Sequence, residues 1–147
     1  MPIKIEVQAK GLDKLASMLS VEKMHKAMDI FLDESAEVVR AEVRAFAPMR
    51  TGRLIESIQK IKLGEMHYAV GSPLDYALYQ EVGTRPHMIY PRSAKALRFE
   101  IGGIEVFARY VRHPGFPGRR YFAKALAYYS IIWRDLAKRV ISMVMRE

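Results

Sequence analysis

Two long stretches of the chain place hydrophobic residues at intervals of three and four, the spacing of one face of an α-helix. The first is predicted from about Ser20, a candidate N-cap, to Phe46, and the second from about Arg119 to Met145. The first helix must end near Ala47, because Pro48 disfavours a helical conformation in the residue before it. The first stripe is Val21, Met24, Met28, Phe31, Leu32, Ala36, Val39, Val43 and Phe46, and the second is Phe122, Leu126, Tyr129, Ile132, Trp133, Leu136, Val140 and Met143.

Shorter segments alternate apolar and polar residues and predict strands. They are residues 3–7, the second part of 54–63, and 66–71, where Tyr68 and Val70 share a face. Residues 88–91 are predicted to be short and extended, and 12–19 and 75–81 to be short helical turns. The resulting order predicts an α+β fold, a small antiparallel β-sheet with a protruding β-hairpin, packed against two long helices.

The clearest local signal is a β-hairpin centred on Gly102-Gly103. A two-glycine loop between alternating runs favours a type I′ turn, which needs positive φ at both positions. The predicted register pairs Ile101 with Ile104, Phe99 with Val106 and Leu97 with Ala108, all on one face. It also places Glu100 opposite Glu105, an unfavourable pair unless Arg98 or Arg109 bridges it.

Composition narrows the class of protein. The chain has 147 residues, half of them hydrophobic, and we expect one domain over residues 1–147. The absence of cysteine excludes disulfides and thiolate metal sites. No apolar run reaches the length of a signal peptide or a membrane span, so we expect a soluble protein made in a cytoplasm, with no membrane contact.

The net charge of +8 is concentrated in the second half of the chain. Residues 1–84 contain 11 Lys and Arg against 12 Asp and Glu, whereas residues 85–147 contain 13 against 4. Such a basic half is typical of a protein that binds nucleic acid or an acidic protein partner, or of a surface that needs only solubility.

A search for catalytic chemistry finds little. None of the four histidines is spaced as a metal ligand, no serine lies in a nucleophile motif, and Gly102-Gly103 lacks the lysine of a phosphate-binding loop. Glu81, His87 and His113 can be imagined as a hydrolytic site, but their spacing carries no specific signal. We therefore expect no enzyme activity, no cofactor and no metal.

Three loop regions remain. Two contain turn residues, Pro48, Thr51 and Gly52 in the first and Gly83 and Thr84 in the second. Their charged members, Arg50, Arg53, Glu81 and Arg85, are less needed for folding and better suited to a partner. In the third, Val106–Phe122, the stiff corner His113-Pro114-Gly115 connects the hairpin to the last helix. Together with Arg98 of the hairpin, this region offers Arg109, Arg112, Arg119 and Arg120 to a partner.

The three regions, in this order, resemble the tail-completion or head–tail joining family of long-tailed bacteriophages and prophages. The first motif is matched by Ala47–Leu54 with Ser57 and Ile58, the second by Tyr76, Ala77, Glu81, Gly83 and Thr84, and the third by Lys95–Phe99, Val106–Ala108, Val111–Gly115, Phe122 and Ala125. Many relatives carry a proline shortly before the phenylalanine, where this chain has Arg119-Arg120-Tyr121.

The resemblance implies a structural virion protein in a ring, expected to be a hexamer, at the neck or top of the tail. Its partners would be copies of itself, a neighbouring neck or connector protein and the tail tube protein, with DNA within reach in the lumen. It would be located in the virion and, during assembly, in the host cytoplasm. Two alternatives stay open: a basic nucleic-acid-binding module or nuclease, and a toxin-like hydrolase that uses His113.

Overall fold

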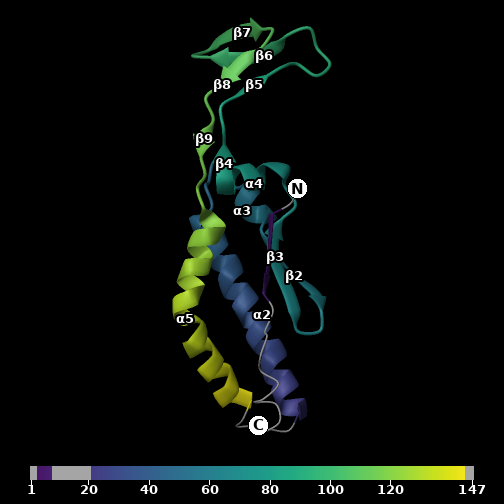
Figure 1. Ribbon diagram of the computed structural model, residues 1–147, viewed down its shortest axis with the longest axis vertical. Coiled ribbons are helices and arrows are strands. Elements are labelled where there is room, and N and C mark those ends of the chain that lie inside the picture. The colour runs from purple at the N-terminus through teal and green to yellow at the C-terminus, as the bar shows by residue number, and fades with distance from the viewer. Residues whose placement is uncertain (1–2, 8–20, 145–147) are drawn as a thin grey trace.

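Two long helices form the body of the molecule, as the sequence predicts. A computed structural model describes residues 3–7 and 21–144. Helices α2 (Val21–Phe46) and α5 (Tyr121–Val144) pack side by side along the long axis of the molecule (Figure 1). The predicted N-cap at Ser20 and the predicted helical turn at 12–19 lie outside the described residues.

A three-stranded antiparallel sheet covers a second face of α2 (Figure 1). It consists of β1 (Ile3–Val7), β2 (Gln59–Gly64) and β3 (His67–Ser72) in the order β1-β3-β2. The central strand β3 is the most buried, and Tyr68 and Val70 contribute to the core as predicted. The mixed fold class predicted from the sequence is confirmed.

Strand β2 turns its lysines, not its hydrophobic residues, toward α2. Lys60 Nζ lies 2.8 Å from an Asp33 carboxylate oxygen, and Lys62 Nζ lies 2.8 Å from one of Asp29. The opposite side of the strand carries Ile61 and Leu63, which are 49% and 45% exposed. Ion pairs with α2 therefore hold this edge of the sheet.

The core lies where α2, the sheet and the start of α5 meet. Its members are Leu32, Ala36, Val39, Val43, Ala47, Leu54, Ile58, Tyr68, Val70, Ala77, Tyr121, Phe122 and Ala125. Most of the stripe predicted on α2 is confirmed, but its two ends are not, because Val21 is 60% and Phe46 41% exposed.

The stripe predicted on α5 is confirmed in part, because Phe122, Leu136 and Val140 are buried and Tyr129 packs against the core. Its members Leu126, Trp133 and Met143 are exposed, and the buried side chains that the prediction missed are Tyr121, Ala125 and Val144. Of the elements that the structure describes, only α2 runs along the length of α5 (Figure 1). A single neighbouring helix covers a narrow strip, so much of a wide hydrophobic face is left in water.

Two short helices, α3 (Arg53–Ser57) and α4 (Asp75–Val82), lie above the body, and from α4 the chain extends into an arm, residues 83–118 (Figure 1). The arm is a ladder of three antiparallel strand pairs. From base to tip the pairs are β4 (Gly83–Thr84) with β9 (Phe116–Pro117), β5 (His87–Ile89) with β8 (Val111–His113), and β6 (Leu97–Ile101) with β7 (Ile104–Ala108).

The hairpin at the tip of the arm confirms the predicted register in full. Ile101 pairs with Ile104 and Glu100 with Glu105. Gly102 and Gly103 have φ values of 58° and 85°, as a type I′ turn requires. Of the two arginines considered as bridges, Arg98 forms an ion pair with Glu105.

The arm has no hydrophobic core of its own. From residue 78 to residue 120, all described, no side chain is buried. Ile104 is 70% exposed, Phe107 65% and Ile101 61%. A two-stranded ribbon of this kind is marginally stable on its own in water, so the arm depends on its attachment to the body at its base.

Candidate functional site

Backbone segments cross very closely where the arm meets the body. Gly83 has a φ of 80°, and a Cβ atom there would overlap the carbonyl oxygen of Phe116. Gly115 has a φ of 76°, and a Cβ there would overlap the carbonyl oxygen of Thr84. Only glycine satisfies both conditions without strain. These two glycines, predicted as turn residues, therefore set how tightly the two sides of the arm's base approach each other.

The chain then returns along α4 and enters α5. The N–H of Arg119 donates to the carbonyl of Gln80 at 2.8 Å, and that of Arg120 to the carbonyl of Glu81 at 3.1 Å. Arg120 has a φ of 52°, which is incompatible with a helix, so α5 begins at Tyr121 and not at Arg119 as predicted.

Glu81 has a role inside the fold that the sequence did not suggest. Its carboxylate accepts the backbone N–H of Phe122 at 2.9 Å and that of Ala123 at 3.2 Å, so it caps the N-terminus of α5. Close by, the buried Tyr121 hydroxyl donates to the carbonyl of Ala77 at 3.0 Å. Burial raises the pKa of Tyr121 well above its usual value. These bonds fix the start of α5 against α4.

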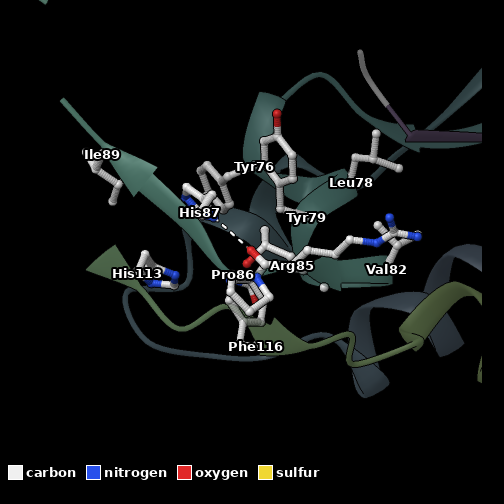
Figure 2. A pocket seen from close by; sticks show the side chains of 13 residues that line it. Tyr76, Leu78, Tyr79, Val82, Arg85, Pro86, His87, Ile89, His113 and Phe116 are labelled. Carbon is white, nitrogen blue, oxygen red and sulfur yellow. Dashed lines mark hydrogen bonds between the residues drawn. The ribbon is translucent and has the colours of Figure 1, made fainter. Parts of the chain in front are cut away.

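An apolar groove of about 740 Å³ opens at this junction, between α4 and the strands at the base of the arm (Figure 2). Its lining residues are Tyr76, Leu78, Tyr79, Gln80, Val82, Gly83, Thr84, Arg85, Pro86, His87, Ile89, His113 and Phe116. Among the described residues, the buried Oγ1 of Thr84 has no hydrogen-bond partner. We refer to this pocket as the apolar groove.

His87 and His113 lie opposite each other on β5 and β8 at one side of the apolar groove (Figure 2). Their rings stack with centroids 5.0 Å apart. Nδ1 of His113 accepts the N–H of Gly115 at 3.0 Å, and Nδ1 of His87 lies 2.9 Å from the carbonyl oxygen of Arg85. Both rings thus stabilise the corner that the sequence predicted at His113-Pro114-Gly115.

A second pocket of about 580 Å³ adjoins the groove and is basic. It is lined by Pro48, Met49, Arg50, Thr51, Gly52, Arg53, Leu54, Tyr76, Gln80 and Arg119. Tyr76 and Gln80 line both pockets, so α4 separates them. None of Arg50, Arg53 and Arg119 forms an ion pair with another described residue. We refer to it as the arginine pocket.

The structure therefore brings together some of the predicted site residues and not others. Arg50, Arg53 and Arg119 share the arginine pocket, and Arg85 lines the apolar groove. Arg98, Arg109 and Arg112 are exposed along the arm, and Arg120 is exposed just before α5. None of these four lines either pocket.

Sequence reasoning missed the hydrophobic side chains that give the groove its character. Tyr76 and Tyr79 are 39% and 53% exposed on α4, and Val82 is 65% exposed at its end. Their spacing of three is a helical signal that could have indicated an exposed apolar face. Over residues 3–7 and 21–144, no three His, Asp or Glu side chains lie close enough together to hold a metal ion.

Residues 9–83 match a protein-family model described as "Bacteriophage HK97-gp10, putative tail-component". The match spans half of the chain and contains every lining residue of the arginine pocket except Arg119. The chain belongs to this HK97-gp10-like family of phage tail components. No curated protein and no solved structure matches the chain.

The HK97-gp10-like match ends at Gly83, where the arm begins. The matched region therefore corresponds to α2, the β2–β3 hairpin, α3 and α4, and the arm and α5 lie outside it. No helix among the described residues combines the length and apolar character needed to cross a bilayer.

Proposed function

We propose that this HK97-gp10-like protein forms a ring, a hexamer, at the head–tail interface or the top of the tail tube, and there joins the tail to the DNA-filled head. Its role is structural rather than enzymatic. Its partners are further copies of the chain, a neighbouring neck or connector protein and the tail tube protein. It assembles in the host cytoplasm and remains in the virion.

The observation that carries this proposal is the arm, residues 83–118, in which no side chain is buried. Exposed apolar side chains on such a segment mark a surface that a partner covers. The arm is elongated and lies at one end of the body (Figure 1). The arm of one copy therefore contacts a different part of the next copy. A heterologous interface of this kind, repeated by rotation, closes into a ring.

Electron microscopy of a phage that lacks this gene tests the proposal. We expect filled heads and tails that are not joined, and complementation with the intact gene restores joined particles. Mass measurement on purified tails supplies the second readout, in which several copies per tail are expected. Joined, infectious particles in the mutant, or a single copy in each tail, contradict the proposal.

Contact with DNA is a second candidate function of the arm, because the arm carries a net positive charge. The arm contains six Lys and Arg against two Glu. In a ring around a DNA passage, Arg109 and Arg112 can neutralise phosphates without reading sequence.

A further inference from the structure

The tip of the arm carries an unusual combination of side chains. Ile101 and Ile104, beside the turn, are 61% and 70% exposed. Glu100 and Glu105 flank them and are the only acidic residues of the arm. These two glutamates face each other across the hairpin, and Arg98 neutralises only Glu105. Among the described residues Glu100 has no ion-pair partner, so an arginine from outside would relieve this repulsion.

The two pockets at the base of the arm, which together we call the junction, have the complementary chemistry. The apolar groove offers the side chains of Tyr79 and Val82, and the adjoining arginine pocket offers Arg50, Arg53 and Arg119. No acidic residue lines either pocket. A ligand that fits both therefore has hydrophobic side chains next to carboxylates, which is the composition of the hairpin tip.

We infer that the hairpin tip of one copy of this chain docks into the junction of the next copy. Ile101 and Ile104 enter the apolar groove, and Glu100 reaches the arginine pocket. The tip and the junction lie at opposite ends of the arm (Figure 1), so each copy offers both to others. This inference rests on the proposed ring and identifies the two surfaces that form its subunit interface.

The chemistry of the tip favours a second copy over DNA. The phosphates of DNA repel Glu100. Contact with the charged DNA backbone would also bury little apolar surface of the two exposed isoleucines. Docking into the apolar groove instead removes both isoleucines from water, which is favourable because it buries apolar surface. Basic residues further down the arm stay available for DNA.

Complementary mutants test the inference. The tip variant is Ile101→Asp/Ile104→Asp, and the junction variant is Arg53→Glu/Val82→Asp; all four side chains are exposed. Ile61→Asp/Leu63→Asp, on the exposed side of β2, is the matched control. Analytical ultracentrifugation of the full chain over a concentration series measures self-association, and circular dichroism checks that each variant is folded.

We expect the wild type and the control to form the same oligomer and each test variant alone to be monomeric. An equimolar mixture of the two variants should give dimers and nothing larger. The junction variant supplies the intact tip and the tip variant supplies the intact junction, so each dimer has no further intact surface. Glu100→Arg alone should weaken self-association roughly tenfold, and adding Arg53→Glu should restore it.

Two outcomes overturn the inference and leave the proposed ring intact. In the first, both variants assemble like the wild type. In the second, their mixture stays monomeric while the wild type assembles. A wild type that is monomeric at every concentration and present as one copy per tail rejects the inference together with the ring.

Discussion

The Glu81 carboxylate accepts the backbone N–H of Phe122 at 2.9 Å, so the last turn of α4 caps the first turn of α5. The whole arm lies between these two residues in the sequence, yet its two ends return to within one hydrogen bond of each other. The position of the arm on the body is therefore fixed by a short contact between α4 and α5.

Replacing this cap should destabilise the body. We expect Glu81→Ala to lower the free energy of unfolding by about 1 kcal/mol, because two N–H groups of α5 lose their acceptor. Urea denaturation followed by circular dichroism measures the change. Glu81→Gln keeps one oxygen acceptor and should lose less stability than Glu81→Ala. An unchanged urea midpoint for Glu81→Ala contradicts the capping role.

Gly83→Ala should be far more costly than an ordinary glycine substitution. The new Cβ combines a positive φ with overlap against the backbone of β9, and we expect a loss of about 2 kcal/mol or a displaced arm. Gly64→Ala is the matched control, since a Cβ there meets no atom within 4 Å. Equal unfolding midpoints for the two variants would rule out close approach as the reason for Gly83.

Tyr121→Phe should lower stability by about 1 to 2 kcal/mol, because the Ala77 carbonyl loses its donor in a buried environment. Tyr128→Phe, on an exposed part of α5, should have little effect. Thermal unfolding of both variants at neutral pH provides the comparison. A similar loss for the two tyrosines would show that the buried hydroxyl contributes nothing specific.

Acid should weaken the contact between α2 and the sheet through Asp29. The hydrogen bond from Lys62 Nζ, aided by that from the Tyr68 hydroxyl, lowers the pKa of Asp29 below its ordinary value near 3.8. A lowered folded-state pKa gives stability that is present above the unfolded value and lost as the pH falls through the folded value.

We therefore expect the melting temperature of the wild type to fall more steeply below about pH 4 than that of Asp29→Asn. At pH 7 the variant should be the less stable protein. Glu42→Gln, on the same helix and without an ion pair among the described residues, is the control. Parallel pH profiles for wild type and Asp29→Asn would remove Asp29 from the acid response.

The basic arm should give the free protein a weak, non-specific affinity for duplex DNA that falls steeply with salt. Replacing Arg109 and Arg112 with Ala should make the dependence of log affinity on log salt shallower by roughly 0.9 for each phosphate that is no longer neutralised. Fluorescence anisotropy across a salt series measures this slope. Absence of binding at low salt would exclude DNA as a partner of the arm.

Elements specified by local patterns could be predicted from the sequence. The bounds of α2 follow from its hydrophobic spacing and Pro48, and the hairpin register follows from Gly102-Gly103 and the alternating residues on either side. In each case the signal lies within a few residues of the feature it determines.

Features that depend on segments distant in sequence could not be predicted. The hydrophobic spacing predicts part of the buried face of α5, but the narrow contact with α2 leaves Leu126 and Trp133 exposed, and no local pattern indicates this. The capping role of Glu81 depends on a helix 41 residues away. Likewise, the arginine pocket joins Arg53 to Arg119 only because the arm brings the chain back to its own base. The sequence predicted the arginines as partner residues, and the fold determines which of them share a pocket.

The absence of buried side chains from residue 78 to residue 120 has a consequence for the life of the free subunit. Among the described residues, we expect the backbone amides of the free arm to exchange faster than those of the buried body, and proteases to cut the arm more readily. In the proposed ring a partner covers the arm, and the arm is then protected from both exchange and cleavage. Under the proposed function, subunits left out of a tail are degraded while incorporated ones persist, and the exposed arm thereby limits the pool of unassembled protein.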